Sequence, residues 1–139
     1  MDLQALSAYH LPDSIVDFYR DFDPKRVVEL QVDVPVRLYP IKGVIEQNRG
    51  YEPGVHVAPV GYIAFATTIY GDAYCFDLTR ISEGRCPVVL LTHEIGFGGA
   101  TAEEVAPYAK QVAEDFTDFL RKFIHDELDK EPIDDPDSA

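Results

Sequence analysis

Four side chains with acid–base or metal-binding chemistry lie near the most apolar part of the sequence. They are Asp72, Asp77, His93 and Glu94. Imidazole and carboxylate groups transfer protons and are common ligands of divalent metals. Their spacing matches no zinc motif, and the four histidines are scattered with no His-x-x-x-His pair. An enzyme or metal protein would need all four side chains to converge in one cleft; the alternative is that His93 and Glu94 bond to nearby backbone at a strand end.

A glycine-rich run at 96–99 precedes a predicted helix, which raises the possibility of a phosphate cradle. The run lacks the lysine and the Ser or Thr of a P-loop. Glu103 and Glu104 would fall in the first turn of the next helix, where they complement the helix dipole and repel an anion. No Gly-x-Ser-x-Gly motif is present. We therefore expect a linker at 96–99, no cofactor and no bound metal.

The two cysteines and the N-terminus indicate the cellular compartment. Cys75 and Cys86 form no Cys-x-x-Cys pair, and Cys75 falls in a predicted strand, where a free thiol behaves as a small apolar group. Residues 1–4 have neither a basic region nor a long apolar run, so no signal peptide is predicted. These features favour two reduced thiols in a cytoplasmic protein.

Net charge and hydropathy disfavour nucleic-acid binding and a membrane span. The 139 residues carry 12 Lys or Arg and 25 Asp or Glu, a formal net charge of −13. Such a chain is repelled by nucleic-acid phosphates. No apolar run approaches the roughly 18 residues of a membrane span. The charge fits a basic protein partner, or it serves only solubility.

The charge is concentrated toward the C-terminus. Residues 126–137 contain seven acids and one lysine, which makes −6 in twelve residues. Pro132 and Pro136 interrupt this segment, so we expect a single domain over 1–130 and an acidic, disordered tail over 131–139. The tail either keeps the protein soluble or binds a partner.

Apolar periodicity predicts the elements. Helices are expected at 11–22, 41–48 and 108–128, and extended segments at 27–32, 34–39, 62–69, 73–78 and 88–91. The pair 62–69 and 73–78 is typical of an antiparallel hairpin. Thr101 and Glu104 form a capping box, and Pro107 separates it from the long helix. Clustered strands between terminal helices predict an α+β fold: a central, largely antiparallel or mixed sheet flanked by an N-terminal helix and a long C-terminal helix.

Four motifs, taken in order, resemble one family. They are Leu11-Pro12 with its aromatic helix, the hairpin "IAFATTIYGDAYCFDL" from Ile63, the strand "CPVVLLTHE" from Cys86, and the helix "VAEDFTDFLRKFI" from Val112. Over about residues 11–125 the chain resembles the SUKH superfamily, which includes fungal cell-wall-synthesis regulators and bacterial immunity proteins. The resemblance implies an α+β domain with no known catalytic residues.

For function, the resemblance implies a binding module. Bacterial members typically neutralise a toxin domain, often a nuclease, so we expect a basic toxin as partner and a non-enzymatic role. A regulatory or scaffold module with another partner is the alternative. Exposed acids and aromatics on loops are the expected contacts, namely Tyr70, Asp72, Asp77 and Glu94.

Overall fold

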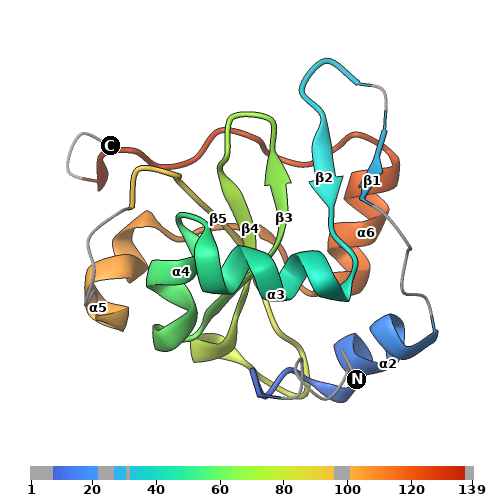
Figure 1. Cartoon of the computed structure of the whole chain (residues 1–139), viewed down its shortest axis with the longest axis horizontal. Coiled ribbons are helices and arrows are strands. Elements are labelled where there is room, and N and C mark those ends of the chain that lie inside the picture. Colours follow the sequence, from blue (N-terminus) through green and yellow to red (C-terminus); the bar gives the residue numbers. More distant parts are fainter. Residues whose placement is uncertain (1–7, 22–26, 31, 96–100, 137–139) are drawn as a thin grey trace.

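Strands that follow one another in the chain are also neighbours in one antiparallel sheet (Figure 1). The computed structural model describes residues 8–21, 27–30, 32–95 and 101–136, and within them the sheet order is β1-β2-β3-β4-β5-β6. The strands are β1 (Val28–Glu29), β2 (Val36–Leu38), β3 (Tyr62–Thr68), β4 (Ala73–Asp77), β5 (Val88–Leu91) and β6 (Lys110–Ala113). The α+β class with an antiparallel sheet is thereby confirmed.

The central hairpin β3–β4 is buried on both faces. Every residue of both strands is buried, and so is every residue of β5. Tyr74 and Phe76 of β4 lie on one face and Cys75 on the other. The first face holds stacked aromatic rings, with the Phe65 and Phe76 centroids 4.0 Å apart. Because both faces are apolar, helices must cover both.

Helices on opposite sides of the sheet supply these covers (Figure 1). The helices are α2 (Asp13–Asp21), α3 (Ile41–Gly50), α4 (Gly54–Val57), α5 (Ala102–Val105) and α6 (Phe116–Ile124), with short 3-10 turns η1 (Ala58–Val60), η2 (Leu78–Arg80) and η3 (Ala106–Tyr108). Phe116, Phe119 and Phe123 of α6 are buried at helical spacing in the cluster that contains Phe65. Val57 and Val105 belong to the cluster on the other face.

The predicted C-terminal helix over 108–128 is wrong in its extent. Lys110–Ala113 forms β6 and pairs with the free edge of β5, and the helix begins only at Phe116. The apolar spacing suited a helix, but β5 is a buried strand whose backbone groups need partners along that edge. Asp115 marks the start of α6, because its side chain accepts a hydrogen bond from the Asp118 N–H at 2.8 Å and so caps the helix.

Other boundaries also differ from the sequence-based expectations. The stretch between the expected helix at 41–48 and the expected strand at 62–69 contains α4 and η1. Of the described residues in the expected strand over 27–32, those at 28–29 form β1. The capping box of Thr101 and Glu104 is confirmed by both reciprocal hydrogen bonds. The glycine run at 96–99 lies outside the described residues.

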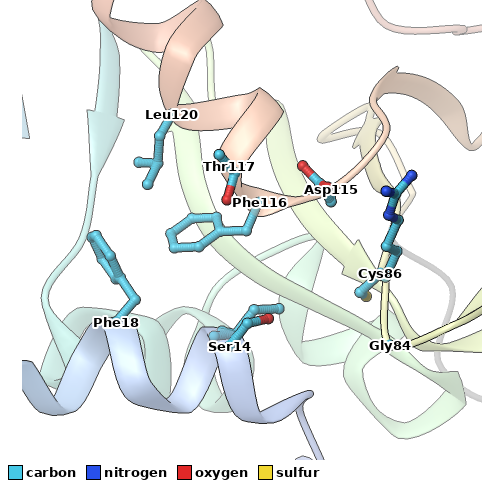
Figure 2. A pocket seen from close by; sticks show the side chains of 10 residues that line it. Ser14, Phe18, Gly84, Cys86, Asp115, Phe116, Thr117 and Leu120 are labelled. Atoms are coloured by element: carbon cyan, nitrogen blue, oxygen red, sulfur yellow. The ribbon is translucent and has the colours of Figure 1, made fainter.

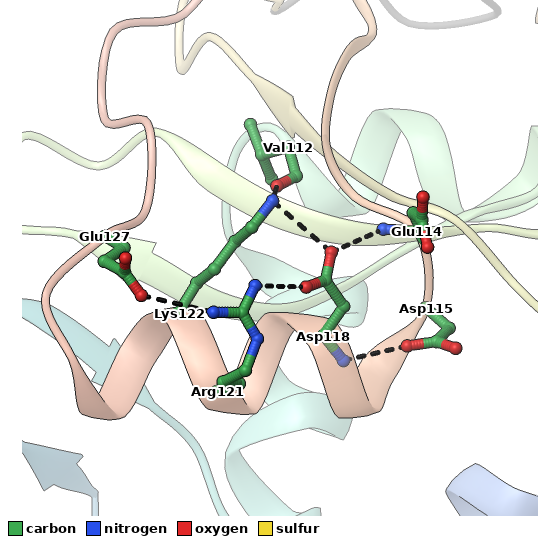
Figure 3. A network of polar contacts seen from close by, with 7 residues as sticks. All are labelled: Val112, Glu114, Asp115, Asp118, Arg121, Lys122 and Glu127. Atoms are coloured by element: carbon green, nitrogen blue, oxygen red, sulfur yellow. Dashed lines mark hydrogen bonds and ion pairs between the residues drawn. The ribbon is translucent and has the colours of Figure 1, made fainter.

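A polar network at the corner between β6 and α6 holds this helix against the sheet (Figure 3). The Asp118 carboxylate accepts from the Glu114 N–H at 3.0 Å and pairs with Arg121 and Lys122. Lys122 also donates to the Val112 carbonyl of β6 at 2.9 Å. The Glu114 N–H is the main reason why the pKa of Asp118 lies below its usual value.

Asn48 of α3 completes the hydrogen bonding of β3. Strand β2 pairs with β3 only between Ala66 and Thr68, so the backbone groups of Ala64 lie beyond its end. The buried Asn48 amide donates to the Ala64 carbonyl and accepts from the Ala64 N–H, each at 2.8 Å. It also donates to Val44 O in its own helix at 2.7 Å. One side chain therefore fastens α3 to the central hairpin.

We predict that Asn48→Ala lowers the free energy of unfolding by roughly 2–4 kcal/mol, because it leaves buried backbone groups of Ala64 without partners. Urea denaturation measures this difference. The exposed Glu46→Ala variant on the same helix should change stability by no more than about 0.5 kcal/mol. Equal losses in the two variants would show that the Asn48 bonds contribute nothing specific.

We predict that Asp118→Ala destabilises the protein by about 1–2 kcal/mol at pH 7, through loss of charged hydrogen bonds at the helix start. The folded-state pKa is lowered, so this stabilisation is present above the unfolded pKa of about 3.9 and is lost as pH falls through the folded value. Thermal unfolding from pH 7 to pH 3 should show the gap between wild type and variant closing. Asp17→Ala, which removes an exposed ion pair with Arg20, is the control and should have little effect.

Candidate functional site

Residues predicted from the sequence meet at one end of the sheet, around the turn that joins β3 to β4. The turn is closed by two backbone bonds, from the Gly71 N–H to Thr68 O at 3.0 Å and from the Thr68 N–H to Asp72 O at 2.9 Å. Gly71 has a φ of +92°, which favours glycine, and its Cα faces His93. The tight turn leaves Tyr70 projecting, with 63% of its surface exposed.

Asp72 and His93 tie this turn to the end of β5. One carboxylate oxygen of Asp72 accepts from the His93 backbone N–H at 3.0 Å and lies 2.8 Å from His93 Nδ1. The Asp72 side chain is buried, whereas the His93 side chain is half exposed. The hydrogen bond with Asp72 raises the pKa of His93 above its usual value. Asp72 therefore orients the imidazole and holds two strand ends together.

The C-terminal segment crosses the same end of the sheet (Figure 1). Tyr74 of β4 donates from its hydroxyl to the Asp129 carbonyl at 2.9 Å. Lys110 of β6 donates to the Glu131 carbonyl at 2.7 Å and pairs with the Asp129 carboxylate at 2.8 Å. The predicted boundary between the domain and an acidic tail at residue 131 stays a prediction. Leu128 is buried in the core, and the bonds to Asp129 and Glu131 place the residues that follow beside the turn.

An open hollow of about 340 Å³ lies between these three parts of the chain. It is lined by Tyr70, Asp72, His93, Glu94, Lys130, Glu131, Pro132 and Asp134. Three of the four sequence-predicted contact residues are thus brought together. The contribution of the C-terminal segment to this hollow was not predicted, although the apolar residues Leu128 and Ile133 within it were a signal that it packs against the domain.

The fourth predicted residue, Asp77, is at the opposite end of β4. It lies five positions along the chain from Asp72, or about 16 Å of extended strand. Its side chain is buried and accepts from the Thr79 N–H at 3.0 Å and from Arg80 Nε at 2.9 Å. The expectation that Asp72 and Asp77 are exposed loop acids is therefore wrong, because both carboxylates are buried and accept hydrogen bonds within the fold.

This separation also contradicts the convergence that an enzyme or metal site would need, because Asp77 cannot reach His93 and Glu94. Within the described ranges, no group of three or more His, Cys, Asp or Glu side chains is arranged to hold a metal ion. The Glu94 N–H bonds to the Thr92 hydroxyl at 3.2 Å, so it is the backbone of this residue that is fixed at the strand end. The Glu94 side chain itself is exposed.

A second hollow, of about 390 Å³, lies between α2, the turn before β5 and the start of α6 (Figure 2). Phe18, Phe116 and Leu120 form its apolar wall. Cys86 also lines it, but burial raises the pKa of this thiol to about 12, so it is protonated at neutral pH and is not a nucleophile. Both Cys75 and Cys86 are buried free thiols.

No described helix has the length and apolar character needed to cross a membrane. The family model of the SMI1 / KNR4 family (SUKH-1) matches residues 2–122. No curated protein and no solved structure matches the chain. The matched range ends before the C-terminal segment, so the residues at 130–134 that line the first hollow lie outside it.

We predict that the imidazole of His93 titrates above the ordinary histidine value of about 6.5, because the Asp72 carboxylate stabilises its protonated form. NMR titration of the ring protons measures this, and Asp72→Asn should lower the midpoint. Because the pKa of His93 is higher in the folded than in the unfolded state, its protonated form stabilises the fold. This contribution is fully present at pH values below the unfolded pKa and is lost as pH rises through the folded pKa. An unchanged midpoint in Asp72→Asn would contradict the assigned interaction.

Proposed function

Because the chain belongs to the SMI1 / KNR4 family (SUKH-1), we propose that it is a non-enzymatic protein-binding module, and specifically an immunity protein that binds and neutralises a basic toxin domain. The observation that carries this proposal is the sheet end around Tyr70. There an exposed tyrosine, a residue type that is enriched in protein interfaces, stands beside exposed acids that a basic partner could pair with.

Charge supports a basic partner. The net charge of −13 would steer the protein toward a cationic surface and raise the association rate. A nuclease toxin carries such a surface, because its groove must hold nucleic-acid phosphates. Occupying the groove with carboxylates would block the substrate by bulk and by charge, and the immunity protein itself would need no chemistry.

Reduced, cytoplasmic conditions fit this proposal. Cys75 and Cys86 are buried as free thiols in the two clusters that cover opposite faces of the sheet. Neither contributes to the hollow around Tyr70. A toxin that reaches the cytoplasm would meet a protein whose fold does not depend on a disulfide.

We predict that the purified full chain binds the toxin domain encoded by the neighbouring gene and protects cells that express that toxin. Surface plasmon resonance at 50 and 500 mM NaCl measures the interaction. The association rate should fall about tenfold or more as salt rises, because salt screens charge steering.

A cationic protein of unrelated fold is the control and should bind weakly at low salt and not at high salt. Absence of binding to the neighbouring toxin, or binding without protection of cells, would contradict the immunity proposal. Binding to a neighbouring protein that has no toxic activity would favour the regulatory alternative instead.

A further inference from the structure

We propose that the hairpin-tip surface, defined here as Ile69, Tyr70, Glu94, Glu131, Pro132 and Asp134, binds an arginine side chain of the protein partner, with its guanidinium over the Tyr70 ring and paired to the surrounding carboxylates. This inference rests on the proposed function, because it names the chemistry that the partner must present at this site.

The apolar part of this surface is exposed to solvent. Tyr70 is 63% exposed and its neighbour Ile69 is 43% exposed, although all the residues of β3 and β4 on either side of the turn are buried. Tyrosine is enriched at interfaces because it adds a large, rigid contact area. The tip is thus the one part of the central hairpin that can act as an anchor in an interface.

The acids around Tyr70 lie near one imidazole: the pKa of His93 is raised first by its hydrogen bond with Asp72, and Glu94 and Asp134 add to this effect. Glu94, Glu131 and Asp134 are exposed, and their carboxylates form no ion pair among the described residues. The two lysines of this region already have partners, since Lys130 pairs with Asp126 and Lys110 with Asp129. The surface therefore has a surplus of negative charge that an incoming cation would neutralise.

The surface is held in place before any partner arrives. The turn carries its own bonds and the buried Asp72 carboxylate joins it to His93. Tyr74 anchors the opposite side through Asp129 O, and burial raises the pKa of its hydroxyl so that it stays a donor at any physiological pH. A binding surface whose backbone is already fixed loses less entropy on binding, which increases affinity.

Arginine fits these features better than lysine does. Its planar guanidinium stacks on an aromatic ring and can pair with carboxylates through two parallel hydrogen bonds. A lysine ammonium is a compact charge that offers no flat face to Tyr70. An exposed tyrosine ring bordered by unpaired carboxylates on two sides of a hollow thus selects for arginine.

Part of the hairpin-tip surface lies outside the residues that the family model matches. The family match ends at residue 122, whereas Glu131, Pro132 and Asp134 lie beyond it. The matched part of the chain supplies Tyr70 and Glu94, and the segment outside the match supplies Glu131 and Asp134. Such an arrangement would let relatives with the same fold recognise different partners.

The first experiment tests the surface without the toxin. The probe is N-acetyl-arginine amide, titrated into the isotope-labelled full chain and followed by NMR. We expect millimolar binding that shifts the amide signals of Tyr70 and Glu94, weaker shifts with N-acetyl-lysine amide, and loss of the shifts in Tyr70→Ala. Tyr51→Ala removes a tyrosine of similar exposure, 58%, and should leave them intact. Shifts that are absent, or that persist in Tyr70→Ala, would overturn the proposal.

The second experiment uses the toxin domain of the neighbouring gene. The triple variant Glu94→Gln, Glu131→Gln and Asp134→Asn should weaken binding about 100-fold, since three charge pairs are lost. The control Glu46→Gln, Glu83→Gln and Glu103→Gln removes the same charge from exposed acids elsewhere and should weaken it less than about threefold. Equal losses in the two variants would overturn the assignment of this surface.

The two experiments separate the two proposals. If the wild-type chain binds the arginine probe at Tyr70 but does not bind the toxin, the proposed function fails and the arginine site stands. If it binds the toxin and the two triple variants behave alike, the proposed function stands and the site fails. Thermal unfolding of each variant shows that it is folded, as expected for substitutions of exposed side chains.

Discussion

Burial of the central hairpin on both faces is the constraint on which the rest of the structure depends. Every residue of β3 and β4 is buried, so the chain must supply an apolar cover on each side. Helix α6 supplies buried phenylalanines on one side, while α4 and α5 supply Val57 and Val105 on the other. The polar contacts of Asn48 and Asp118 then fix how two of the helices meet the sheet.

The same constraint decides where this protein can bind another molecule. A sheet covered on both faces leaves its ends and loops for recognition. At one end of the sheet, the Asp77 carboxylate accepts hydrogen bonds within the fold, so the one partner contact that the sequence predicted there is not available. At the other end, Tyr70 projects from a rigid turn and the C-terminal segment adds acids beside it. The binding role that we propose is therefore placed at this end, where exposed acids add to the overall negative charge of the chain.

Local signals in the sequence were sufficient for much of the fold. The hairpin, β5 and the capping box at Thr101 were all predicted, because each depends on neighbouring residues alone. The stretch from 108 to 128 was mispredicted because Val112 and Phe116 fit helical spacing, while strand β6 exists only through its pairing with β5. Asp115 and Asp118 are a capping pair that could have marked the true helix start.

By itself, the sequence determined the fold class, the family and the excess of negative charge, because these follow from apolar periodicity, motif order and composition. Only the tertiary structure decided which acids are available to a partner. The sequence alone does not distinguish Asp72 and Asp77 from the other acids. In the fold, both are buried and accept hydrogen bonds, whereas Glu94 and Asp134 are exposed and form no ion pair among the described residues. The physical reason is that folding decides which hydrogen-bond donors lie beside each carboxylate, and these donors come from other parts of the chain. A carboxylate that has no such donors stays available to a partner.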